Sequence, residues 1–243
     1  MKIYILTLFP KESEAFFLKG LLAKAYEKKK FDIEFFDIRN FAYDKHSRVD
    51  DYPFGDRKGM LIKADVLYKA ITSIENYAEY RIIYTCPKGE VFNQQQAEEF
   101  SQETKGLIMI SGCYEGIDER IFSLFDITKI SIGDFVLTNG DMPSMIIADT
   151  VLRYVPGVLG NLDCVYNDSF SNSLLEAPQY TVPREFKSEL VPDVLLNGNH
   201  EKIADWKKQE ALKQTIFLKP DLLVNADISE NDKRKIVDIL VID

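Results

Sequence analysis

Glycines that follow short apolar runs are the first sign of ligand chemistry in this chain. Gly112 comes after residues 107–110, Gly133 after Ile132, and Gly140 after residues 135–137. When parallel strands end in glycine turns, backbone amides can approach a ligand closely, and open α/β sheets bind ligands at that edge. The same pattern is also typical of glycines that only form tight turns. From spacing alone both interpretations stay open.

Two charged residues are candidates for proton chemistry. Arg153 lies in an otherwise apolar helical run, and a buried guanidinium needs an acid or a ligand as its partner. Asp168 is an isolated carboxylate in a polar stretch, where most such residues cap helices or form turns. Arg153 is therefore the more informative of the two.

Metal and nucleotide motifs are incomplete. His200 and Glu201 begin like a zinc-protease helix, but Ala204 stands where the second histidine is needed, and His46 is the other histidine of the chain. The cysteines lack the paired spacing of structural zinc sites: Cys86, Cys113 and Cys164. The chain has no phosphate-binding glycine loop, no G-x-S-x-G elbow and no dinucleotide fingerprint. We therefore expect no metal ligands.

The segment 43–59 interleaves charged and aromatic side chains without a strong helix or strand pattern. Aromatic rings can stack on unpaired bases while cations hold phosphates, which makes Arg48, Arg57 and Lys58 candidate RNA contacts. Asp50 could accept hydrogen bonds from a guanine edge. The alternative is a solvated loop that packs on its own aromatic rings, and the residues alone slightly favour that alternative.

Composition limits the function classes. The 243 residues are 46% hydrophobic and 28% charged, with a formal net charge of −9, so bulk charge does not favour a protein that coats nucleic acid, and we expect no DNA partner. No apolar run reaches the length of a membrane span, and the first ten residues lack a signal-peptide cleavage site. With three dispersed cysteines the chain fits a reducing cytoplasm.

Alternating strand and helix patterns predict an α/β fold with a mostly parallel sheet flanked by helices. We expect one main domain over 1–160, a polar linker over 161–173 and a small, mostly helical C-terminal domain over 174–243. Strands are predicted at 2–8, 31–38 and 80–86 and then through Ile132, and helices at 11–30, 64–77, 94–102, 143–154, 199–214 and 230–239. Asn93 is the predicted cap of the helix at 94–102.

An ordered set of short motifs across nearly the whole chain resembles one family, the bacterial tRNA (guanine-N(1))-methyltransferases of the SPOUT class. The motifs are Leu8-Phe9-Pro10, Asp44-Lys45-His46, Val49-Asp50-Asp51, Gly59-Met60, the run 114–120, the run 131–134, the run 155–160, Asp168-Ser169-Phe170, Tyr180-Thr181 and Gly198-Asn199-His200. Each motif is weak by itself, but their order is highly specific.

The resemblance implies a deep trefoil knot in the region 111–160, which ordinary topology rules would not predict. It implies S-adenosylmethionine as cofactor, with a dependence on magnesium. It also implies a homodimer whose active site is shared between subunits, with the tRNA guanosine just 3′ of the anticodon, position 37, as the target. By position the cofactor site falls on Tyr84, Thr85, Cys86, Pro87, Gly112, Tyr114, Glu115, Gly116, Ile132, Gly133, Leu137 and Gly140.

The resemblance also assigns catalytic roles. Guanine N(1) carries a proton and becomes nucleophilic when a base removes it while charge on the 6-oxo oxygen is stabilised. Asp168 matches the base, Arg153 matches the group beside that oxygen, and Glu115 falls beside the methyl donor. The C-terminal domain is expected to contact tRNA.

The sequence departs from the family pattern at several positions. Cys113 replaces an arginine, Asn139 a glycine, and residues 56–58 a glycine-rich run, while Gln179 and Val182 replace a histidine and an arginine. These departures leave two alternatives to the main hypothesis. One is a diverged homologue that methylates another RNA, and the other is a non-enzymatic protein that binds cofactor or RNA.

Overall fold

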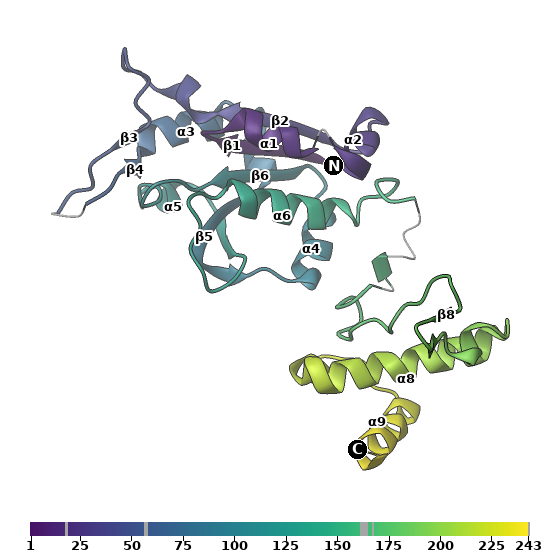
Figure 1. Cartoon of the computed structure of the whole chain (residues 1–243). Coiled ribbons are helices and arrows are strands. Elements are labelled where there is room, and N and C mark those ends of the chain that lie inside the picture. Colours follow the sequence, from purple (N-terminus) through teal and green to yellow (C-terminus); the bar gives the residue numbers. More distant parts are fainter. Residues whose placement is uncertain (18, 56–57, 161–164, 167, 243) are drawn as a thin grey trace. The chain divides into compact units, whose positions relative to one another are not determined.

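The computed structural model describes residues 1–17, 19–55, 58–160, 165–166 and 168–242 (Figure 1). The chain divides into two compact units, 1–162 and 163–243. Each unit has its own buried core, so each is described by itself.

The first unit is built on a sheet of parallel strands in the order β2-β1-β6-β5-β7. Their bounds are β1 Lys2–Thr7, β2 Asp32–Asp37, β5 Arg81–Val91, β6 Gly106–Ser111 and β7 Ile127–Ser131. The central strands are continuous apolar runs, and all six residues of β6 are buried. Such runs are typical of strands covered on both faces, so the predicted α/β class with a parallel sheet is confirmed.

Helices cover this sheet (Figure 1). They are α1 Pro10–Phe17, α2 Gly20–Glu27, α3 Ala64–Thr72, α4 Gln94–Ser101, α5 Ile121–Leu124 and α6 Asp141–Leu152, with 3-10 turns η1 Ile38–Phe41 and η2 Tyr77–Glu79. Helix α3 packs Val66 and Ile71 into one core with Tyr4 and Leu6 of β1. The predicted cap at Asn93 is confirmed, because its side chain accepts from the Gln96 amide at 2.9 Å.

Several expected elements were wrong in their extent, among them α3, which ends at Thr72 and not at residue 77. The single helix expected over 11–30 is two helices, because Gly20 adopts a φ of +66°, which a continuing helix does not permit. Strand β5 does not end at Cys86 but resumes pairing with β7 after a register shift between Thr85 and Glu90. Helix α6 begins at Asp141, two residues before the expected Pro143.

The segment expected to be a long loop contains a short antiparallel pair. Strand β3, Asp50–Asp51, pairs antiparallel with β4, Leu61–Ile62, and these strands with the described residues between them, 52–55 and 58–60, are called the β3–β4 hairpin. The pairing places Asp50, one of the predicted RNA-contact residues, opposite Ile62.

The second unit contains α8 His200–Leu218, α9 Glu230–Ile242, 3-10 turns η3 Asp193–Leu195 and η4 Pro220–Val224, and the hairpin β8 Glu185–Phe186 with β9 Glu189–Leu190. Its core gathers around Leu174, Leu212 and Ile239. Of the predicted linker, residues 161–164 and 167 lie outside the described residues, and Ser171 donates to the Val165 carbonyl oxygen at 2.6 Å. The domain boundaries at 160 and 173 stay predictions.

Candidate functional site

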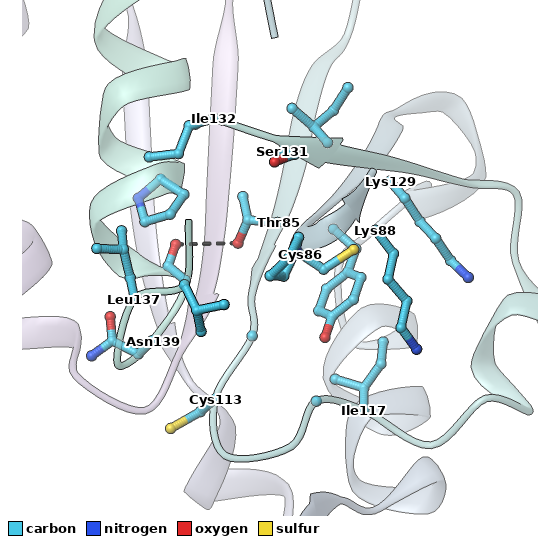
Figure 2. Close-up of a pocket in the computed structure, with 18 of the residues that line it drawn as sticks. Thr85, Cys86, Lys88, Cys113, Ile117, Lys129, Ser131, Ile132, Leu137 and Asn139 are labelled. Atoms are coloured by element: carbon cyan, nitrogen blue, oxygen red, sulfur yellow. Dashed lines mark hydrogen bonds between the residues drawn. The ribbon is translucent and has the colours of Figure 1, made fainter. Parts of the chain in front are cut away.

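A cavity of about 360 Å³ lies beside the ends of β6 and β7 and the bulge of β5 (Figure 2). Its wall comes from three segments: 84–88 at the β5 bulge, 112–117 after β6, and 129–140 leading from β7 into α6. The carboxyl ends of parallel strands meet at one edge, which is where open α/β sheets bind ligands. The volume falls within the range of small-molecule sites.

Every residue that the resemblance assigns to the cofactor lines this cavity: Tyr84, Thr85, Cys86, Pro87, Gly112, Tyr114, Glu115, Gly116, Ile132, Gly133, Leu137 and Gly140. Thus the structure brings together three sequence segments that are up to 56 positions apart, from Tyr84 to Gly140 (140 − 84). Apolar side chains such as Ile132 and Leu137 lie on one side, and Lys88 and Lys129 on the other (Figure 2).

The closest backbone contact in this wall is at Gly140. Its amide donates to the Gly112 carbonyl oxygen at 2.6 Å, and its own carbonyl accepts from the Thr85 hydroxyl at 3.2 Å (Figure 2). A Cβ atom at Gly140 would lie 2.3 Å from Thr85 Oγ1 and 2.5 Å from the Gly112 nitrogen. Because both neighbours are buried, a side chain at position 140 would overlap them, so this position requires glycine.

Asp141, directly after Gly140, is a buried carboxylate that the sequence pattern did not single out. Its carboxylate is buried and accepts from the hydroxyls of Thr7 and, at 3.3 Å, Ser13. Burial raises the pKa of this carboxyl, although the hydroxyl donors act in the opposite direction. Asp141 therefore ties the start of α6 to the end of β1. The one sequence signal is an acidic residue at the start of an apolar helix.

Two departures from the family pattern are neighbours in space. Cys113 and Asn139 form an isolated antiparallel bridge, and both line the cavity. Burial raises the pKa of the Cys113 thiol. Nearby, Tyr84 is buried and its pKa is raised chiefly by that burial, so its hydroxyl stays neutral. These residues form a neutral part of the wall.

Of the predicted RNA-contact residues, Asp50 and Lys58 lie on the β3–β4 hairpin and Arg48 precedes it. Burial of Tyr114 is the largest cause that raises the pKa of its hydroxyl. The charge of half-buried Asp50 and its hydrogen bond to Tyr114 raise this pKa further. Arg48 Nε donates to Asp44 at 2.7 Å, and the Arg48 contacts lower the pKa of Asp44 to about 2. Lys58 is exposed, and Arg57 lies outside the described residues. Asp50 thus links the hairpin to a residue of the cavity wall.

Of the two predicted proton-chemistry residues, Arg153 is not part of this wall. Arg153 follows the last residue of α6, whereas Gly140 and Pro143 at the other end of that helix line the cavity. Twelve helical residues span about 18 Å. Asp168 belongs to the second unit, is half-buried, and its amide donates to the Val165 carbonyl oxygen at 3.4 Å.

Neither a metal-binding cluster nor a membrane helix occurs in the described part of the chain. No group of three or more His, Cys, Asp or Glu side chains is placed there to hold a metal ion. None of its helices has both the length and the apolar character that a membrane crossing requires.

Comparison with known proteins identifies the family. The family model described as "tRNA (Guanine-1)-methyltransferase TrmD" matches residues 1–225. The chain belongs to this family. Among curated relatives, the tRNA (guanine-N(1)-)-methyltransferases of Dictyoglomus turgidum and Geotalea uraniireducens are 44% and 46% identical, and each alignment covers 96% of this chain and 94% of the relative.

A third curated relative, the tRNA (guanine-N(1)-)-methyltransferase of Geobacillus kaustophilus, is 45% identical over 96% of both chains. Identity at this level over nearly the full length confirms the resemblance that the ordered motifs indicated. The tRNA (guanine-1)-methyltransferase family therefore provides the framework for interpreting the cavity.

Proposed function

We propose that this protein transfers a methyl group from S-adenosylmethionine to guanine N(1) of tRNA. Membership of the family supports the reaction. Every predicted cofactor position lines one cavity beside the strand ends, and this observation supports assigning the reaction to particular residues. We assign S-adenosylmethionine to that cavity.

The cavity fits this cofactor in its size and in the chemistry of its wall. Apolar side chains from the segment 132–143 can cover an adenine ring, and backbone groups at the glycine turns can hydrogen-bond its edge. Glu115 adds a carboxylate that complements positive charge. When bound, S-adenosylmethionine supplies an electrophilic methyl group carried on a sulfonium.

The protein must also make the guanine nucleophilic. An aspartate carboxyl has a pKa of about 4 and guanine N(1) about 9, so proton transfer between them is uphill by about 5 units, or roughly 7 kcal/mol. We assign Asp168 as the base that takes this proton. Arg153 is assigned to stabilise the negative charge that grows on the 6-oxo oxygen, where a planar guanidinium can donate two hydrogen bonds.

We further propose that the active site is completed by a second copy of the chain. Arg153 lies about 18 Å along α6 from the cavity that the same helix begins, which is farther than an arginine side chain reaches. Apolar side chains beside that cavity are exposed in the single chain: Phe135, Val136, Met142 and Ile146. A homodimer would bury them and could bring the partner's arginine to the cavity.

The remaining features that the resemblance implies are proposals as well. A trefoil knot in 111–160 is supported by the close passage of Gly140 against Gly112. The hairpin 50–62 and the C-terminal unit are proposed to bind the anticodon region, with position 37 as the target. A dependence on magnesium and a cytoplasmic location stay predictions.

Mass spectrometry of nucleosides from tRNA incubated with protein and S-adenosylmethionine tests the reaction. We expect 1-methylguanosine at position 37 with the parent, and almost none with Asp168→Asn, while cofactor affinity stays within a few-fold. Methylation confined to another RNA would support the diverged homologue. Tight cofactor binding with no methylated RNA at all would favour the binding-only alternative, and 1-methylguanosine made freely by Asp168→Asn would refute the assigned base.

Mixed dimers test the shared site. Glu115→Ala and Arg153→Ala chains, each strongly impaired but still measurable alone, should recover activity when co-assembled, because one site of each mixed dimer combines an intact Glu115 with the partner's intact arginine. Random mixing makes half of the dimers mixed with one good site of two, so about a quarter of the parent activity is expected. No recovery in a verified mixed dimer would mean that each subunit builds its own site.

A further inference from the structure

Gly59 lies directly against the side chain of Glu115. A Cβ atom at Gly59 would be 2.4 Å from Glu115 Cγ and 2.9 Å from both Cδ and Oε1. The backbone of Gly59 has a φ of +103°, which glycine adopts without strain. Gly59 therefore leaves open the space that the Glu115 side chain occupies.

The residues after Gly59 are fixed to the cavity segment by backbone hydrogen bonds. The Glu115 amide donates to the Met60 carbonyl oxygen, the Ile62 amide to the Gly116 carbonyl oxygen, and the Asp118 amide to the Ile62 carbonyl oxygen, each at 3.0 Å. Ile62 and Ile117 also form a parallel bridge, and both are buried. These contacts fix the separation between the two backbones, so an added side chain at 59 cannot be accommodated by moving them apart.

We propose that Gly59 is a positioning residue for Glu115, so that the end of the RNA-contact hairpin determines where this carboxylate enters the cofactor cavity. The inference rests on the proposed function in one respect, namely that Glu115 acts beside the methyl donor. Glu115 is exposed, and its side chain can rotate where the clamped backbone cannot. A methyl group at position 59 therefore displaces the carboxylate and leaves the fold intact.

The test is a double-mutant cycle between Gly59→Ala and Glu115→Ala, measured as single-turnover methyl transfer to tRNA and as cofactor affinity by calorimetry. Misplacement of a reacting group by about 1 Å can cost as much as a hundredfold in rate, so Gly59→Ala should lose roughly tenfold to a hundredfold. In the Glu115→Ala background the same change should cost less than about twofold, because the group through which Gly59 acts is gone.

Gly20→Ala is the matched control. Gly20 also has a positive φ, +66°, but no atom lies within 4 Å of a Cβ built there. This variant carries backbone strain without displacing a neighbour, so it should match Gly59→Ala in thermal stability and the parent in methyl transfer.

Two results would overturn the inference: Gly59→Ala transferring methyl groups as fast as Gly20→Ala, or an equal loss from Gly59→Ala in both backgrounds. A parent that methylates no RNA would instead refute the proposed function. The cycle is then judged on cofactor affinity. If Gly59→Ala and Glu115→Ala each lower the affinity and the double variant is no worse than Glu115→Ala, the positioning role is supported. If the two losses add, or if Gly59→Ala loses no affinity, the positioning role is rejected.

Discussion

The cofactor cavity and the hairpin beyond it are built in opposite ways. Around the cavity, buried side chains such as Thr85 and Asp141 bond to segments distant in the sequence, and Gly140 is in close contact with two backbones. In the hairpin, Tyr52 is 76% exposed and Phe54 is fully exposed. The cavity is thus formed by the folded chain itself.

The hairpin, in contrast, has the features of a surface that a partner completes. Large exposed aromatic rings gain free energy when a base or another surface covers them. The nearby ion pair between Asp44 and Arg48 joins residues only four positions apart, so it stabilises a local turn. We therefore expect changes in the cavity to affect cofactor binding first, and changes to the exposed side chains of the hairpin, such as Phe54, to affect tRNA binding.

The largest effect is expected from Gly140→Val. A branched side chain would overlap Thr85 Oγ1 and the Gly112 nitrogen, so the wall must move, and cofactor affinity should fall by at least about a hundredfold in calorimetry. Gly160→Val is the control, because no atom lies within 4 Å of a Cβ built at Gly160. Cofactor binding by Gly140→Val at the parent's affinity would show that the cavity is not preformed.

The next effect concerns Phe54→Ala. Stacking on one base contributes about 1–3 kcal/mol, so tRNA affinity should fall by roughly fivefold to a hundredfold in a filter-binding or polarisation assay. Cofactor affinity and thermal stability should not change, since Phe54 is fully exposed. Leu21→Ala removes a half-exposed apolar side chain elsewhere and should leave tRNA binding unaltered. If both variants bind tRNA equally well, the hairpin is only a solvated loop.

A smaller effect is expected from Lys58→Ala. A lysine that neutralises one phosphate releases about one counterion, so its loss should reduce the slope of log affinity against log salt by about 1. Sequence preference should stay the same, because phosphate contacts carry no base information. Lys11→Ala, another exposed lysine, serves as the comparison. Equal slopes for the two variants would remove Lys58 from the RNA surface.

The smallest effect concerns Asp141, the buried carboxylate at the start of α6. Burial raises the folded pKa of Asp141 above its unfolded value, so the folded state holds this proton more tightly. The resulting stabilisation is present below about pH 4 and is lost as pH rises through the folded pKa. Asp141→Asn should reduce this fall in the free energy of unfolding with rising pH, measured by urea unfolding from pH 4 upward. The amide oxygen of the asparagine can still accept a hydrogen bond from Thr7. Parallel pH profiles would show that Asp141 carries no such linkage.

Local signals in the sequence determined the parallel α/β class and the helix caps. A cap such as Asn93 or Asn199 acts within four residues, and the buried strands are continuous apolar runs that need no tertiary information. The ordered motifs likewise determined the family, and through it the set of residues that line one cavity.

Tertiary structure decided what depends on residues far apart in the chain. Thr7 and Asp141 are 134 positions apart, and no periodicity links them. The close approach of Gly59 to Glu115, and the separation of Arg153 from its own cavity by the length of α6, follow equally from how the backbones pack and not from spacing. A sequence pattern indicates which residues share a local element. Only packing of the elements fixes which side chains meet, because that contact depends on the position and orientation of both backbones at once.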